Sequence, residues 1–227
     1  MEFSIKSGHP PKASCDCIVV GVFDSRQLSA PAQELDKAAG GHLAGILRRG
    51  DMEGKSGSTL LVHGTPGIAA ERVLLVGLGK EAEFGEKAYR DALAAAVRAL
   101  KDTGSKNASI TLSELPVARR NAAWRVRQGA LVAHDVLYRS DQLKSKKDNA
   151  SPSLSAIAFS VAGKDAKSAS AALMQGIAIA QGMNLTRELG NLPANICTPT
   201  YLAQQAQKLA KTFKLKCEVL DRARMEK

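Results

Sequence analysis

The sequence has few aromatic residues, few cysteines and no long apolar run. Phe, Trp and Tyr together make up 4% of its 227 residues, and it contains 4 cysteines. So few cysteines exclude a disulfide-rich scaffold in a chain of this length. No apolar run approaches the roughly 20 residues that span a bilayer, and the first residues lack the basic and apolar regions of a signal peptide. We therefore expect a cytoplasmic protein with no membrane partner.

A recognisable catalytic or metal-binding cluster is also missing from the sequence. Its carboxylates are scattered, and its 4 histidines have no Ser or Cys partner at a recognisable spacing. Cys15 and Cys17 are close in sequence, but no second Cys or His pair follows at zinc-finger spacing, so buried free thiols are the better interpretation. We assign no catalytic residue and no metal ligand within this chain.

Short aliphatic runs alternate with longer helical patterns, which is typical of an α/β fold with a parallel or mixed sheet. Most of the runs are continuously apolar, as expected for strands that helices cover on both faces. Strands are predicted over residues 17–23, 59–63, 72–77, 109–112 and 154–161. Helices are predicted within residues 32–47, with a break at Gly40-Gly41, and over 89–100 and 124–137.

A long helical pattern over residues 165–189 follows this α/β region. At 1.5 Å per residue such a helix would span about 37 Å, a length suited to an interdomain connector. Gly190 is a natural C-cap, and Thr198 and Pro199 are suited to begin a further helix as N-cap and first residue. Residues 216–220 are predicted to form the first strand of a following domain.

Basic residues exceed acidic ones by 32 to 22, and the stretch 119–147 carries +6 of the net +10. This stretch is either a solvated helix face with a polar loop or a surface for acidic partners. Only Trp124 and Tyr138 could stack on bases, which favours phosphate contacts with duplex DNA over single-strand binding. The candidate DNA-binding residues are Arg119, Arg120, Arg125, Arg127, Lys144, Lys146 and Lys147.

The turn Gly77-Leu78-Gly79-Lys80 offers a second binding hypothesis. It follows a predicted strand, and its backbone N–H groups could cradle the phosphate of a nucleotide. It departs from both the dinucleotide and the P-loop patterns, and acidic Glu81 and Glu83 follow where a nucleotide site needs neutral or basic groups.

Residues 191–203, NLPANICTPTYLA, resemble the entry into the catalytic domain of the leucyl (cytosol) aminopeptidases. Residues 1–8, 47–55 and 72–80 resemble the bacterial branch of the same family. Each piece is weak alone, but their order along the chain makes the combination specific.

The resemblance implies a two-metal enzyme, carrying Mn or Zn, that releases amino-terminal residues from peptides and assembles as a homohexamer. It implies a macro-domain-like mixed sheet flanked by helices and followed by a long connecting helix. Bacterial members also bind DNA. The family's active-site motifs, a Lys-containing Gly-rich segment, Asp-Ser-Gly-Gly and Asn-Thr-Asp-Ala-Glu-Gly-Arg, do not occur in this sequence.

We therefore expect an amino-terminal α/β domain over residues 1–164, a linker helix over 165–190 and the truncated start of the catalytic peptidase domain over 191–227. Together they would form the non-catalytic part of a metal-dependent leucyl aminopeptidase, inactive as this chain alone. The alternative is a stand-alone binding module for duplex DNA, through residues 119–147, or for a nucleotide.

Overall fold

A computed structural model describes residues 1–140, 143–144 and 154–226. Contacts between residues divide the chain into two compact units, unit 1 over Met1–Ala180 and unit 2 over Gln181–Lys227. The boundary falls within the longest helix, so each unit is described on its own.

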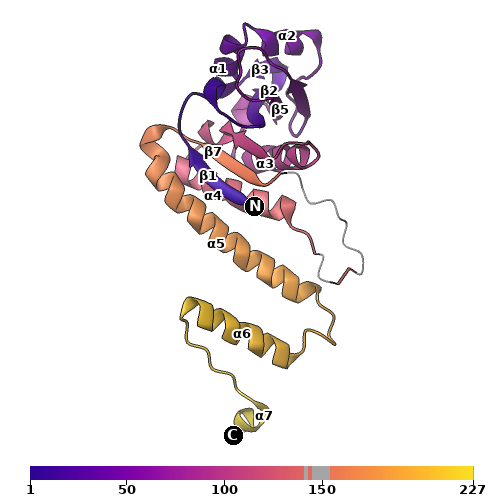
Figure 1. The fold of residues 1–227 in the computed structure, drawn as a ribbon, viewed down its shortest axis with the longest axis vertical. Helices are drawn as coiled ribbons and strands as arrows, with labels where there is room; N and C mark the ends of the chain where they lie inside the picture. The colour runs from indigo at the N-terminus through magenta and orange to yellow at the C-terminus, as the bar shows by residue number, and fades with distance from the viewer. Residues whose placement is uncertain (141–142, 145–153, 227) are drawn as a thin grey trace. The chain divides into compact units, whose positions relative to one another are not determined.

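Unit 1 is built on a mixed sheet of seven strands, ordered β1-β7-β6-β2-β5-β4, with β3 paired to β2. The neighbours run parallel except for β4 beside β5 and β3 beside β2. The parallel pair of β1 and β7 at one edge of the sheet brings together the beginning of unit 1 and residues near its end in the sequence (Figure 1). The strands are β1 (Glu2–Lys6), β2 (Cys17–Phe23), β3 (Gln27–Leu28), β4 (Thr59–His63), β5 (Arg72–Gly79), β6 (Asn107–Ile110) and β7 (Ala156–Ser160).

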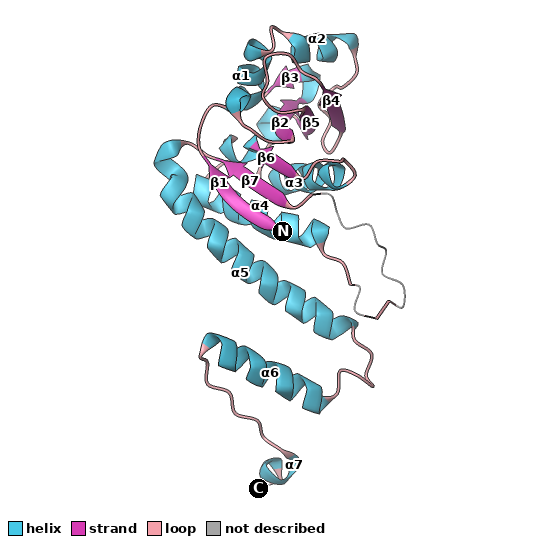
Figure 2. Cartoon of the chain, viewed as in Figure 1, coloured by secondary structure: helices cyan, strands magenta, loops and turns pink. Residues whose placement is uncertain are grey.

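Helices lie on both faces of this sheet, which confirms the predicted fold class (Figure 2). The helices of the chain are α1 (Ala30–Ala38), α2 (His42–Arg49), α3 (Glu86–Lys101), α4 (Ala122–Leu137), α5 (Ala166–Asn191), α6 (Pro199–Phe213) and α7 (Arg222–Met225). None of the described helices is long and apolar enough to cross a membrane.

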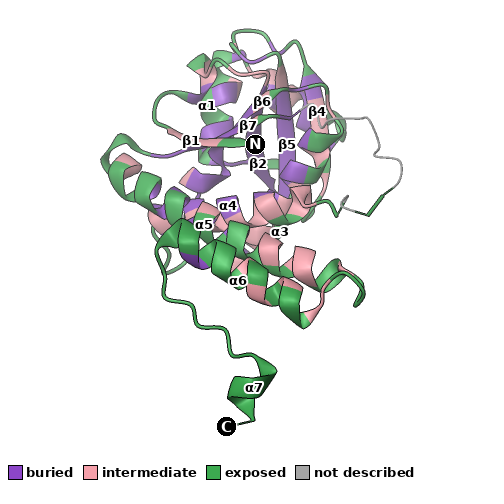
Figure 3. Cartoon of the chain, turned by 60° about the horizontal axis from the view of Figure 1, so that its bottom comes forward, coloured by how far each residue is buried: buried purple, intermediate pink, exposed green. Residues whose placement is uncertain are grey.

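The central strand β2 is buried along its whole length, and its side chains alternate between two hydrophobic clusters. Val19 belongs to the larger cluster, which α3, α4 and the first half of α5 complete. Val20 points the other way, into the cluster that α1 and α2 complete. Figure 3 shows the central strands as buried. Continuous apolar sequence is therefore required here, because each successive side chain enters a core.

The predicted break at Gly40-Gly41 is present between α1 and α2. Both glycines adopt left-handed backbone conformations, with φ of 63° and 83°, which a side chain would disfavour. The Asp36 carboxylate accepts a hydrogen bond of 3.0 Å from the Ala44 backbone N–H and so satisfies one free donor of α2. The sequence signal and the observed corner thus have the same cause.

The strand predicted over residues 109–112 lies two residues earlier in the structure, at Asn107–Ile110. Strand β6 begins earlier and stops at Ile110, and a short 3₁₀ turn, Thr111–Glu114, follows. Side-chain bonds hold this turn: the Thr111 hydroxyl donates to the Val19 carbonyl (2.8 Å) and the Ser113 hydroxyl to the Ser160 carbonyl (2.6 Å). These partners lie far away in sequence, so local periodicity could not show where the strand ends.

In unit 2 the start of α6 is as predicted. The Thr198 side chain caps the helix by accepting from the Tyr201 N–H at 3.3 Å, and Pro199 is the first helical residue. Helix α5 continues one residue beyond the predicted cap at Gly190. Residues 216–220, predicted to begin a following domain, have no regular secondary structure here, and among the described residues none pairs with them as a strand.

His134 links α4 to the sheet edge. Its ring centre lies 4.9 Å from that of Phe3 on β1, and its Nε2 atom is buried without a hydrogen-bond partner among the described residues. Burial first, and the nearby amino terminus second, lower the pKa of His134 below the ordinary value of 6.5. Protonation would therefore place an unpartnered charge in this contact.

We predict that acid weakens unit 1 through His134. Because the pKa is lower in the folded state, the unfolded chain binds the proton more tightly. Above pH 6.5 the ring is neutral in both states, and its contribution to the free energy of unfolding is complete. This contribution falls as the pH drops below 6.5 and becomes constant below the folded-state pKa. Thermal unfolding between about pH 7.5 and pH 5 should show a smaller loss of Tm for His134→Phe than for the parent. Equal losses in the two proteins would contradict the assignment.

Candidate functional site

The seven candidate DNA-binding residues do not share one environment. Arg119 and Arg120 lie in the turn before α4, and Arg125 and Arg127 lie on α4. Lys144 belongs to a short, separately described segment. The remaining two candidates, Lys146 and Lys147, lie outside the described residues.

Arg120 is engaged within the protein. Its guanidinium contacts the Glu86 carboxylate of α3 at 2.6 Å and 2.7 Å and lies 5.1 Å from the centre of the Trp124 ring. The Glu86 carboxylate neutralises the positive charge of Arg120 that would attract a phosphate. The Trp124 ring beside Arg120 is buried. The loop before α4 is thus fastened to α3 by one of the candidate residues.

Arg125 is half-buried and also acts internally. Its Nε donates to the Ser113 carbonyl at 2.7 Å and its Nη1 to the Arg120 carbonyl at 3.0 Å. These bonds satisfy carbonyl groups that the loop leaves without helix or sheet partners. Charge counting along the sequence could not separate this structural arginine from a surface one, because the carbonyls it binds belong to irregular backbone.

Arg127 is half-buried beside α5. A Cβ atom added to Gly176 of α5 would lie 3.0 Å from the Arg127 carbonyl oxygen, so the two helices approach closely at this point. Of the candidate arginines, Arg120 is therefore paired with an acid and Arg125 binds backbone carbonyls, whereas Arg119 is exposed and the close approach at Arg127 involves its backbone.

The Gly77–Lys80 turn has no free phosphate cradle. The Gly77 N–H donates to the Ser58 carbonyl at 2.8 Å, and the Gly79 N–H donates to the Gly54 carbonyl at 2.9 Å. The Lys80 ammonium contacts Glu83 at 3.1 Å. Two of the backbone donors that the nucleotide hypothesis invokes, those of Gly77 and Gly79, are therefore already bonded within the protein.

The glycines instead allow a loop to lie against β5. A Cβ atom on Gly77 would fall 2.0 Å from the Lys55 carbonyl oxygen and 2.3 Å from the Ser58 hydroxyl oxygen. Contacts this short cannot be accommodated without moving backbone. The role of Gly77 is therefore close packing, which the sequence shows only as a small residue at the end of an apolar strand.

The described residues do not fit a two-metal centre. No group of three or more His, Cys, Asp or Glu side chains gathers in the described parts of the chain. Burial raises the pKa of the Cys17 thiol to about 12 and also raises that of Cys15, so both remain protonated at neutral pH. A metal site of the kind the resemblance implies would need other ligands.

The segment that carries the family resemblance forms a turn followed by a helix in unit 2. The N–H groups of Ile196 and Cys197 both donate to the Pro193 carbonyl at 2.9 Å, and the Thr198 cap then starts α6. Pro, Thr and Pro at these positions thus have direct structural roles.

Two family profiles match the chain. The cytosol aminopeptidase family N-terminal domain matches residues 19–147, and the family's catalytic domain matches residues 184–227. The chain belongs to the cytosol aminopeptidase family. The residues that match the family's amino-terminal domain lie within unit 1, and those that match its catalytic domain lie within unit 2.

Relatives of this cytosol aminopeptidase family member cover its whole length. A probable cytosol aminopeptidase of Dechloromonas aromatica is 56% identical over 100% of this chain, which spans 46% of that relative. The bottromycin maturation enzyme BotP in complex with Mn is 25% identical, with a TM-score of 0.69 over 93% of this chain and 40% of the other. A mutant of tomato leucine aminopeptidase has the same fold, with a TM-score of 0.76 over 100% of this chain and 45% of the other, at 23% identity.

We predict that Gly77→Ala destabilises unit 1 by about 1–3 kcal/mol, because the new methyl group overlaps the Lys55 carbonyl. Gly45→Ala in α2 is the matched control. Nothing lies within 4 Å of its added Cβ, and alanine favours a helix interior by about 0.5–1 kcal/mol. Urea unfolding of the three proteins measures the difference. A Gly77→Ala protein as stable as the parent would show that the loop moves freely.

Proposed function

We propose that this chain is the amino-terminal, non-catalytic part of a two-metal leucyl aminopeptidase that releases amino-terminal residues from peptides. The observation that carries the proposal is the match of both family domains, in family order, along one chain. The chain spans about half the length of the curated relatives it matches, so the activity belongs to a longer protein.

In this proposal residues 1–164 form the amino-terminal domain, 165–190 the linker helix and 191–227 the beginning of the catalytic domain. The amino-terminal domain would position the catalytic domain or limit access to its site, since unit 1 has its own two-sided core and a metal cluster is lacking among its described residues.

The cofactors of the longer protein are proposed to be two divalent ions, Mn or Zn. The Mn complex of BotP supports a metal requirement. When bound, such ions polarise the peptide carbonyl and supply hydroxide at neutral pH. The described residues hold no set of ligands for them, so no step of this chemistry is assigned to this chain. A homohexamer in the cytoplasm, acting on peptides, completes the proposal.

Duplex DNA binding has no structural observation in its favour. Arg120 and Arg125 are engaged in internal contacts, and two candidates lie outside the described residues. The aminopeptidase proposal is preferred because it accounts for both units of the chain.

We predict that the purified chain does not hydrolyse leucine p-nitroanilide with added manganese or zinc, because its described residues include no carboxylate cluster to hold the ions. A chimera in which this chain replaces the matching segment of the Dechloromonas aromatica relative should be active, since the two are 56% identical there. Chelation should abolish that activity and added metal should restore it.

The unmodified relative is the control for assay conditions. An inactive chimera that folds and keeps the relative's oligomeric state would contradict the proposed function. Chelator-sensitive turnover by the chain alone would contradict the assignment of the chemistry to residues outside it.

A further inference from the structure

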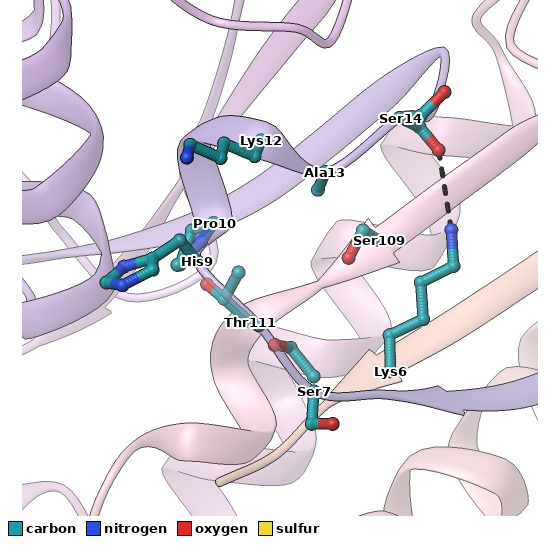
Figure 4. A pocket seen from close by; sticks show the side chains of 11 residues that line it. Lys6, Ser7, His9, Pro10, Lys12, Ala13, Ser14, Ser109 and Thr111 are labelled. Atoms are coloured by element: carbon teal, nitrogen blue, oxygen red, sulfur yellow. Dashed lines mark hydrogen bonds between the residues drawn. The ribbon is translucent and has the colours of Figure 1, made fainter. Parts of the chain in front are cut away.

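A cavity of about 390 Å³, lined in part by lysine and hydroxyl side chains, lies at the carboxyl ends of β1, β6 and β7 (Figure 4). Its lining combines side chains from these strands with the 7–14 loop that follows β1. The residues used in the argument are Lys6, His9, Lys12, Ser109, Thr111 and Ser160. The carboxyl ends of parallel strands are a common place for small-molecule sites in open α/β sheets.

Hydroxyl side chains line the cavity because this half of the sheet has two different faces. On β7, Ile157 and Phe159 enter the larger core, and Ser160 follows on the opposite face. On β6, Ala108 and Ile110 enter the same core, so Ser109 faces the other way. The α1 and α2 cluster includes no residue of β6 or β7 within the described chain.

Strand register then brings the polar groups together. Lys6 of β1 is directly beside Ser160 of β7, and Ser109 of β6 is beside Ala158 of β7. One ammonium and two hydroxyl groups are therefore held on rigid, adjacent strands. Because these groups are already ordered, a ligand that binds them causes little further loss of conformational entropy in the protein.

The cavity is positively charged. Lys6 and Lys12 have no carboxylate within ion-pair distance among the described residues. The Lys6 ammonium instead makes a long contact of 3.4 Å with the Ser14 carbonyl across the cavity (Figure 4). Near the rim, His9 lies 3.8 Å from the Glu34 carboxylate, and both side chains are exposed. Each of the Lys6 and Lys12 ammonium groups favours an anion on its side of the cavity, whereas the Glu114 carboxylate lies beside Ser160.

The hydroxyl groups supply the remaining hydrogen-bond capacity. Ser109 is 2% exposed, lines the cavity and makes no side-chain hydrogen bond with the described residues. The Thr111 hydroxyl donates to the Val19 carbonyl, and the Ser160 hydroxyl donates to Glu114, so their oxygens can still accept. The Ser109 hydroxyl is therefore open to the cavity and can donate to or accept from a molecule bound there.

We propose that this cavity binds a small hydroxylated molecule that carries an oxyanion, such as a sugar phosphate or a sugar acid. The ammonium groups of Lys6 and Lys12 lie on opposite sides of the cavity (Figure 4), so one of them binds the oxyanion, and Ser109, Thr111 and Ser160 bind the hydroxyl groups. The volume is within the usual range of about 300–1,000 Å³ for small-molecule sites. This binding site is separate from the proposed peptidase activity.

Isothermal titration calorimetry of the 227-residue chain tests the proposal with glucose 6-phosphate, gluconate and glucose. The two anions share the sugar's hydroxyl groups but differ in the oxyanion, and glucose has none. We expect at least one anion to bind saturably and about tenfold or more tighter than glucose, because each charged contact contributes appreciably. Tighter binding of one anion identifies a phosphate or a carboxylate ligand. No saturable binding, or equal binding of glucose, would overturn the proposal.

The variant Lys6→Gln/Lys12→Gln should weaken binding of the preferred anion by about tenfold or more, and Ser109→Ala by a few-fold. Lys106→Gln is the matched control, since Lys106 directly precedes β6 at the opposite end of that strand. It should bind like the parent. Thermal unfolding confirms that each variant is folded. Unchanged binding in the folded lysine double variant, or equal weakening by Lys106→Gln, would place the ligand elsewhere and refute the assignment.

Discussion

The fold of unit 1 depends on the pairing of β2 with β5 and on the burial of both strands from either side. The pair runs parallel from Cys17 beside Arg72 to Phe23 beside Gly79, with one irregularity near its end. Every residue of β2 is buried, and burying one large aliphatic side chain contributes about 1.5–3 kcal/mol. The residues that complete both clusters all belong to unit 1, so its core needs nothing from unit 2.

This two-sided burial also determines where the chain can be polar. Near the end of β5 the loop that contains Lys55 and Ser58 lies so close that only glycine fits at position 77. Carbonyl groups of Gly54 and Ser58 accept hydrogen bonds from the Gly79 and Gly77 N–H groups. On β6 and β7 the second helical layer is absent from the described residues, and hydroxyl side chains replace aliphatic ones on that face. One sheet thus provides a closed surface at one place and a cavity lined in part by lysine and hydroxyl side chains at another.

The sequence predicted the features that depend on local pattern. The apolar run at β2, the glycine corner before α2 and the Thr198 cap of α6 were correct because nearby residues determine them. Features that depend on distant partners were missed or wrong. Strand β1 alternates Phe3 and Ile5 with polar residues and is recognisable only beside β7, whereas residues 216–220, which include Lys216 and Glu218, have no described partner strand. Basic residues were counted as one surface although Arg125 binds loop carbonyls.

The central claim is that unit 1 folds on its own core. Amide hydrogen exchange of the 227-residue chain and of a version ending at Ala180, at the observed unit boundary, tests it most directly. The account predicts that the amides of β2 and β5 exchange equally slowly in both proteins, since slow exchange reports the global stability of the unit. Loss of protection in these two strands of the shorter protein would show that unit 2 is needed to hold the core together and would contradict the claim.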